Sequence, residues 1–209
     1  METRKQAPEI LFIGNSITQH PKLDVVGWPL DAGMASTRLE NDYVHQTIAI
    51  LKQRGLELEP ILGSRDCDIC DGVIGEHIEN ADAVWDIRPR YVVVQLGENS
   101  TLEEIRSGRL TEQYLELLKA LRHYGAERIF CVSNWDENTL STARNEAILR
   151  AIRRFPEIRI VDISGLAGDP SNYGDTAVYP DENVSWHPGD LGMRRIAERL
   201  ADAILEDKR

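Results

Sequence analysis

The chain has 209 residues, of which 42% are hydrophobic and 28% charged, a balance that excludes a disordered protein and favours one folded domain spanning residues 1–209. Its formal net charge of −11 argues against a nucleic-acid partner and against anionic membrane surfaces, because both bind through clustered Lys and Arg. No apolar run approaches the roughly 18 residues of a membrane span. The segment after Met1 has no apolar signal region, so a protein that starts there is expected to stay in the cytoplasm.

Short apolar segments alternate with longer amphipathic ones along the chain. Strands are predicted at 10–14, 56–62, 91–96, 128–133 and 158–163. The central strands are nearly all apolar, as expected of parallel strands covered by helices on both faces. Pro60 fits an edge strand or a strand end, because proline cannot donate to a sheet.

Helical periodicity fills the intervals between these strands. Helices are predicted at 42–54, 111–123, 141–155 and 191–205, with Thr111 and Asp190 as candidate N-caps. The alternation predicts an α/β fold with a central parallel sheet of about five strands. Two long irregular stretches, 19–40 and 164–186, interrupt the pattern, and loops of this length are often functional.

In such a sheet ligands bind beyond the carboxyl ends of the strands, so the residues that follow each strand are candidates for a site. The segment 14–18 (GNSIT) follows the first strand, and Ser16 would present its hydroxyl at the mouth of the sheet. If a helix follows, its N–H groups would help to hold an oxyanion. Taken alone, the segment favours an ordinary turn, because Gly, Asn and Ser are common turn formers.

Two further segments bring polar groups to the same rim, the end of the sheet at which the strands have their carboxyl ends. The third strand ends in 97–99 (GEN), where Asn99 could donate its side-chain amide to a developing negative charge or simply cap a turn. His187 lies before the last predicted helix, in a segment that Pro188 and Gly189 break. Its position beyond the last strand predicts that it lies on the same rim as Ser16.

Together these three segments resemble the sequence blocks of the SGNH hydrolase superfamily, also called GDSL-like lipases and acylhydrolases, from the first strand to the last helix. The resemblance implies a three-layer α/β/α sandwich of flavodoxin-like type. It also implies a serine esterase that forms an acyl-enzyme, with Ser16 as nucleophile, His187 as general base and Asn99 as an oxyanion donor. The family's oxyanion glycine is loosely matched by Gly63, with Gly33 as the competing residue. This chemistry requires no metal and no organic cofactor.

The sequence departs from the family pattern at the acid that usually precedes the histidine by three residues, because Val184 stands there. The expected arrangement is a Ser-His dyad whose imidazole is oriented by a backbone carbonyl, or by a carboxylate from elsewhere; Asp181 and Glu182 are close but wrongly spaced. A missing acid also fits a catalytically impaired carbohydrate- or ligand-binding protein on the same scaffold. A flavodoxin-like phosphate or FMN binder is a further alternative, in which His187 has no role.

Three tryptophans, Trp28, Trp135 and Trp186, lie in or next to the predicted rim loops. They could stack on a sugar ring, which favours a small-molecule ester of an acylated carbohydrate as substrate, or they could pack beneath the loops. Cys67 and Cys70 form a C-x-x-C pair, but the third and last cysteine lies in an apolar strand, so we expect structural thiols and no metal site.

Overall fold

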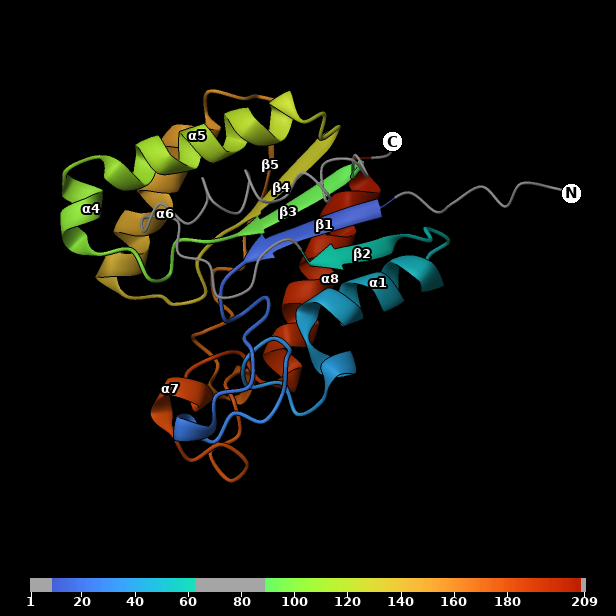
Figure 1. Cartoon of the computed structure of the whole chain (residues 1–209), viewed down its shortest axis with the longest axis vertical. Coiled ribbons are helices and arrows are strands. Elements are labelled where there is room, and N and C mark those ends of the chain that lie inside the picture. The colour runs from blue at the N-terminus through green and yellow to red at the C-terminus, as the bar shows by residue number, and fades with distance from the viewer. Residues whose placement is uncertain (1–8, 63–88, 208–209) are drawn as a thin grey trace, which may run out of the picture.

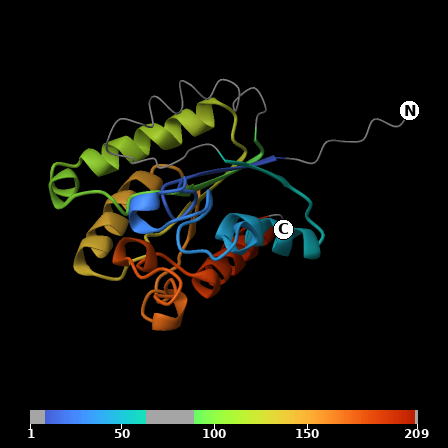
Figure 2. The same cartoon turned by 60° about the horizontal axis from the view of Figure 1, so that its bottom comes forward.

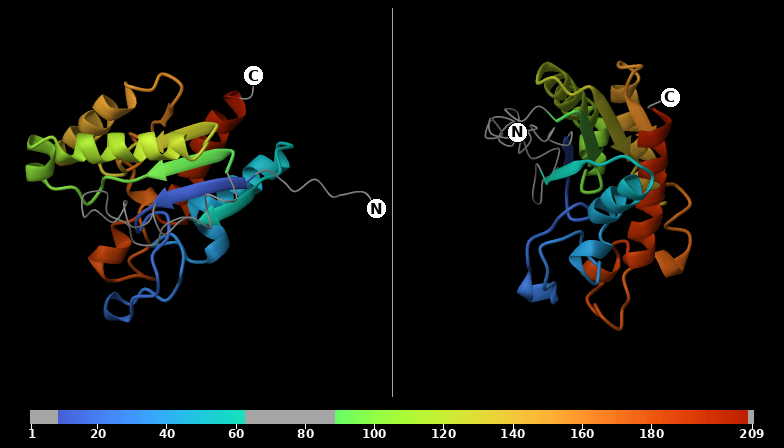
Figure 3. Two further views of the ribbon diagram at one scale, coloured as in Figure 1. Left: turned by 45° about the horizontal axis from the view of Figure 1, so that its top comes forward. Right: turned by 90° about the vertical axis from the view of Figure 1, so that its right-hand side faces the viewer.

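The computed structural model describes residues 9–62 and 89–207. Within them the chain forms a five-stranded parallel sheet with the strand order β2-β1-β3-β4-β5. The strands are β1 (Glu9–Gly14), β2 (Glu59–Leu62), β3 (Tyr91–Gln95), β4 (Arg128–Val132) and β5 (Arg159–Val161). All five predicted strands are confirmed, although β2 and β5 are shorter than predicted. Pro60 lies in β2 at one edge of the sheet, as expected (Figure 3).

The four predicted helices are confirmed, and shorter ones lie between them. The α-helices are α1 (Tyr43–Gln53), α4 (Leu102–Arg106), α5 (Arg109–His123), α6 (Thr139–Ile152), α7 (Glu182–Ser185) and α8 (Asp190–Glu206). Three 3-10 helices are η1 (Asp24–Val26), η2 (Leu39–Asn41) and η3 (Pro170–Asn172). No helix in the described ranges is long and apolar enough to cross a membrane.

Both predicted N-caps are wrong. Helix α5 begins after Gly108, and Thr111 lies inside it, where its hydroxyl donates to the Ala147 carbonyl. Asp190 is the first residue of α8 and not its cap. Its carboxylate instead accepts hydrogen bonds from the backbone and side chain of Thr37, so it ties the long 19–40 segment to the helix.

Helices cover both faces of the sheet and make three layers. Alternate strand residues point to opposite faces, so Ile10 and Phe12 pack against α1 and α8, whereas Leu11 and Ile13 pack against α5 and α6. Figure 2 shows α5 on one side of the sheet and α1 with α8 on the other. The structure therefore has the predicted three-layer α/β/α architecture.

The strand order places a topological switch point at β1. The chain leaves β1 for β2 on one side of the sheet and returns to β3 on the other. The loops after β1 and β3 therefore diverge, and open α/β sheets bind ligands in the crevice formed there. All strands run in one direction, so both loops lie at the same end of the sheet (Figure 1).

The segments 19–40 and 164–186 lie side by side beyond this end of the sheet (Figure 1). They share a small core in which Trp28 packs on Tyr179 with ring centroids 5.5 Å apart. The Tyr179 hydroxyl also donates to the Ser36 carbonyl at 2.8 Å. Both segments, predicted to be irregular, contain short helical turns and are tied to one another, which gives the rim a fixed shape.

Candidate active site

Ser16 lies on a tight turn directly after β1. Residues 16–18 form one turn, in which the N–H groups of Thr18 and Gln19 donate to the Asn15 carbonyl. No helix follows this turn directly, so the helix N–H groups considered as oxyanion donors are not present there. A Cβ on Gly14 would lie 1.8 Å from Thr18 Oγ1 and 2.8 Å from the Gln95 carbonyl oxygen. Glycine is therefore required for the turn to fold back over β3.

His187 lies on the short loop between α7 and α8, and its backbone is held on both sides. Its N–H donates to the Val184 carbonyl at 3.0 Å, and its own carbonyl accepts from the Gly174 N–H at 2.8 Å. The preceding carbonyl, that of Trp186, accepts from the buried indole N–H of Trp135 at 3.2 Å. These contacts fix the direction in which the imidazole leaves the chain.

The structure brings the two predicted catalytic side chains together. His187 Nε2 lies 2.7 Å from Ser16 Oγ, and His187 Nδ1 lies 3.2 Å from the Val184 carbonyl oxygen. A carbonyl can only accept, so Nδ1 carries the proton in the neutral ring and Nε2 is the acceptor for the serine hydroxyl. This tautomer is the one that a general base for Ser16 requires.

The imidazole is electrically neutral at pH 7. His187 is 7% exposed, and burial lowers its pKa to about 4, a shift that the Val184 carbonyl opposes and the nearby His20 reinforces. No carboxylate in the described ranges forms a hydrogen bond or ion pair with this ring. Asp181, one of the two nearby acids, caps α7 by accepting from the Asn183 N–H. Of the two arrangements predicted for a chain with Val184, the structure has the backbone carbonyl.

Asn99 follows β3 on an exposed turn that the Ser100 N–H closes by donating to the Gly97 carbonyl at 3.1 Å. Gly97 has a φ of +123°, a backbone conformation that favours glycine. Since Gly14 of β1 is paired with Gln95 of β3, Ser16 and Asn99 leave neighbouring strands at the same end of the sheet.

Of the two glycines considered as oxyanion donors, the structure describes only Gly33. Gly63 lies outside the described residues. Gly33 is buried behind the serine turn, where a Cβ would lie 2.6 Å from the Ile17 carbonyl oxygen. The next residue, Met34, donates its N–H to the Ser16 carbonyl at 2.8 Å, so the Gly33 segment supports the turn from behind.

A buried polar cluster next to Asn99 was not predicted. Glu98 is buried, and its Oε1 accepts from the Gln95 side chain and from the Trp135 N–H. Burial raises the pKa of its carboxyl, against the opposing effect of these donors and of Arg144. The signal in the sequence was Gln95, a polar residue at the end of an otherwise apolar strand. The cluster joins the ends of β3 and β4, and Trp135 extends it to the His187 loop.

The predicted sugar platforms are partly wrong. Trp28 and Trp135 are 0% exposed and pack beneath the loops, where neither can stack on a ligand, whereas Trp186 is 36% exposed. Cys67 and Cys70 lie outside the described residues. Cys131 is buried in β4, and burial raises the pKa of its thiol to about 12.

A scan against protein-family models and a search of curated proteins each found no match. Solved structures are similar in fold. A family 3 carbohydrate esterase of Clostridium thermocellum is 14% identical, with a TM-score of 0.70 over 97% of this chain and 98% of that one. The psychrotrophic esterase EstA of Pseudoalteromonas sp. is 14% identical, with a TM-score of 0.66 over 95% and 97%. A family 3 carbohydrate esterase of Talaromyces cellulolyticus is 17% identical, with a TM-score of 0.62 over 96% and 97%.

At these identities the similarity shows that this chain shares the fold of those structures, and it does not show which reaction the chain catalyses. The chain has the fold of the SGNH hydrolases, as its three sequence blocks predict.

Proposed function

We propose that this chain is a serine esterase that hydrolyses a carboxylic ester through an acyl-enzyme. The observation that carries the proposal is the 2.7 Å contact between Ser16 Oγ and His187 Nε2, with Nδ1 directed at the Val184 carbonyl. A nucleophile, a base and a group that orients the base are the three parts of an activated serine. They lie together beyond the carboxyl end of β1, at the switch point of the sheet.

The reaction follows from the tautomer. His187 Nε2 takes the proton of Ser16 as Oγ attacks the ester carbonyl, and the resulting imidazolium returns it to the leaving alcohol. Water then attacks the acyl-enzyme with the same base, which frees the carboxylic acid and restores Ser16. No metal or organic cofactor is needed for either step.

Oxyanion stabilisation is assigned to the Ser16 N–H, to the Asn99 side-chain amide and to one glycine N–H. The position of Asn99, on an exposed turn that follows the strand next to β1, supports its role. The glycine is Gly63 or Gly33. Each such donor is typically worth about 3 kcal/mol in the transition state. Asn99→Ala is therefore expected to lower kcat about a hundredfold or more.

The substrate that we propose is an acylated carbohydrate. Two of the solved structures with this fold are carbohydrate esterases, and the exposed Trp186 next to the base offers a flat apolar surface of the kind that binds sugar rings. The acidic chain disfavours anionic substrates.

Hydrolysis of p-nitrophenyl acetate by the wild type, Ser16→Ala and His187→Ala tests the proposal. We expect turnover in the wild type and its loss in both variants. Ser107→Ala, which removes the exposed serine at the C-cap of α4, should keep it. Equal turnover in Ser16→Ala and the wild type would overturn the assignment.

One observation favours a second candidate, a binding protein that has lost catalysis. The imidazole has no carboxylate partner in the described part of the chain, and the loss of that partner can cost orders of magnitude in rate. This candidate predicts ligand binding without turnover on any ester. The flavodoxin-like alternative gives the Ser16–His187 contact no role and is not proposed.

A further inference from the structure

An open cavity of about 840 Å³ begins one residue before the catalytic histidine. Its walls are the segments 170–176 and 182–186, which hydrogen bonds of the Gly174 N–H to the Ser185 and His187 carbonyls hold together. Cavities of this size accept ligands of a few rings. Nothing in the hydrolytic mechanism accounts for it, because the mechanism uses only Ser16, His187 and the oxyanion donors.

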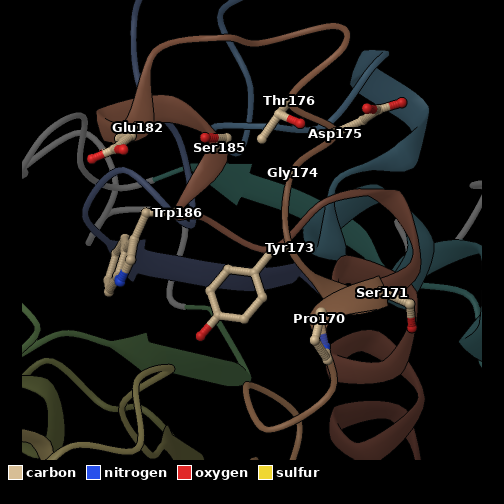
Figure 4. A pocket seen from close by; sticks show the side chains of 9 residues that line it. All are labelled: Pro170, Ser171, Tyr173, Gly174, Asp175, Thr176, Glu182, Ser185 and Trp186. Atoms are coloured by element: carbon tan, nitrogen blue, oxygen red, sulfur yellow. The ribbon is translucent and has the colours of Figure 1, made fainter.

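The cavity has an aromatic side and a polar side. In Figure 4 Trp186 and Tyr173 extend from the two segments toward the same side, while Glu182, Thr176 and Asp175 lie on the other. Both rings are fixed from behind. Trp186 meets the His187 ring edge to face at 5.1 Å, and Tyr173 packs on the buried Trp135 at 5.5 Å.

The charges around the cavity select the ligand. Carboxylates of Asp175 and Glu182 line it, and no lysine or arginine of the described residues does. Burial raises the pKa of the Tyr173 hydroxyl, and the negative charges of Asp136 and Glu137 raise it further. A phosphate or carboxylate ligand would be repelled. A long acyl chain would place apolar groups against these carboxylates and offer them no hydrogen-bond donor. A ring that carries both apolar C–H faces and many hydroxyl donors satisfies both sides.

We propose that this cavity binds a sugar ring, the alcohol part of the ester, with Trp186 as the stacking platform and Asp175 and Glu182 as acceptors for its hydroxyl groups. The inference rests on the proposed function, since the bound sugar presents its acyl group to Ser16. The edge contact between Trp186 and His187 places the platform directly next to the base.

Kinetics on two substrates test the subsite. For Trp186→Ala we expect KM for acetylated xylo-oligosaccharides to rise about tenfold, as for loss of a well-packed aromatic contact, and kcat/KM to fall more for the sugar ester than for p-nitrophenyl acetate. Leu191→Ala, which removes another exposed apolar side chain outside the cavity, is the matched control and should leave both unchanged.

Two variants that do not contact His187 guard against a local effect on the base. Asp175→Asn and Glu182→Gln should each raise KM for the sugar ester about fivefold and leave p-nitrophenyl acetate unaffected, because hydrogen bonds to charged groups are the stronger ones. Glu103→Gln on α4 is their control. Unchanged KM for the sugar ester in all three cavity variants would overturn the inference. It would also be overturned if the variants lost hydrolysis of a cationic ester, acetylcholine, and kept hydrolysis of the sugar ester.

Binding without turnover separates this inference from the proposed function. Saturation-transfer NMR should show that xylotriose binds to the Ser16→Ala protein. In the double variant with Ser16→Ala and Trp186→Ala the xylotriose signals should disappear. Sugar binding together with no ester turnover in the wild type would support the cavity and reject the esterase. Turnover of p-nitrophenyl acetate that depends on Ser16, without xylotriose binding, would support the esterase and reject the cavity.

Discussion

In the part of the chain that the structure describes, the His187 ring is hydrogen-bonded to Ser16 and to the Val184 carbonyl and to no carboxylate. The Val184 carbonyl fixes its tautomer, because it accepts the Nδ1 proton at 3.2 Å. A carbonyl dipole stabilises the imidazolium less than a full negative charge does, so orientation is retained and part of the electrostatic stabilisation is lost. We therefore expect a competent but slow hydrolase with an unusually acid-tolerant base.

The pH dependence of kcat/KM reports this base directly. His187 acts only when deprotonated, and burial lowers its pKa to about 4 from the ordinary value of 6.5. The acid limb for p-nitrophenyl acetate should therefore lie near pH 4, with a plateau above about pH 5.5. Assays in a pH-stat between pH 3.5 and 8, with circular dichroism to confirm that the protein stays folded, would measure it. A limb near pH 6.5 would contradict the described environment of the ring.

The same shift has a consequence for stability. Between about pH 4 and 6.5 the unfolded chain binds the His187 proton more readily than the folded one, so the contribution of this residue is complete above pH 6.5 and falls toward pH 4. His187→Asn should therefore lose less thermal stability than the wild type between pH 7 and 5. The measurement is the melting temperature of each protein as a function of pH. The same pH dependence in both proteins would mean that the pKa of His187 in the folded state is normal, and would contradict the prediction.

Asp181 is the aspartate that most closely precedes His187 in the sequence, and in the structure its side chain caps a helix. It caps α7, and asparagine caps a helix equally well. Asp181→Asn should keep kcat within about twofold, whereas loss of a true triad acid costs about 10⁴. A fall of three orders of magnitude in kcat on p-nitrophenyl acetate, with an unchanged melting temperature, would restore the triad.

At the scale of elements, the ends of β3 and β4 and the loop after α7 are joined through one tryptophan. Trp135 donates its backbone N–H to Glu98 and its indole N–H to the Trp186 carbonyl. The segment that carries Asn99 and the segment that carries His187 are thereby held in one arrangement. Trp135 is a positioning residue, because its hydrogen bonds go to Glu98 and Trp186 and it acts on His187 through the loop.

Trp135→Phe removes the indole donor and keeps most of the buried ring. We expect kcat to fall at least about tenfold with KM nearly unchanged, because small displacements of a base are costly in rate. Tyr114→Phe is the control: Tyr114 is equally buried but packs with α5 on the opposite face of the sheet. Equal losses of kcat in the two variants, matching equal losses of stability, would reduce Trp135 to a structural residue.

At the scale of the whole molecule, sheet and helices follow from patterns that the sequence displays. Apolar strands and amphipathic helices each lie on a surface that must be buried, so their periodicity was sufficient to predict them. The caps were wrong because Thr111 and Asp190 form contacts with distant segments, which local spacing does not encode. The burial of Trp28 and Trp135 depends on how two long loops pack together, and no periodicity describes that.

The candidate site also has parts that the sequence predicted and parts that it did not. Ser16 and His187 were predicted because each lies beside residues that break a regular element and because their segments resemble SGNH sequence blocks, and the fold brings the two side chains within hydrogen-bonding distance. The Glu98 cluster joins segments far apart in sequence, and the polar Gln95 was its one signal. The cavity at Trp186 depends on how the segments 170–176 and 182–186 pack on one another, which no motif encodes.

The central claim is that Ser16 is a nucleophile activated by His187. Fluorophosphonate labelling of the folded protein, followed by peptide mass spectrometry, measures this without knowledge of the substrate. We predict one phosphonyl group per chain on Ser16, no label in Ser16→Ala and strongly slowed labelling in His187→Ala. Absence of label from the folded wild type, or label at the same rate in His187→Ala, would contradict the claim.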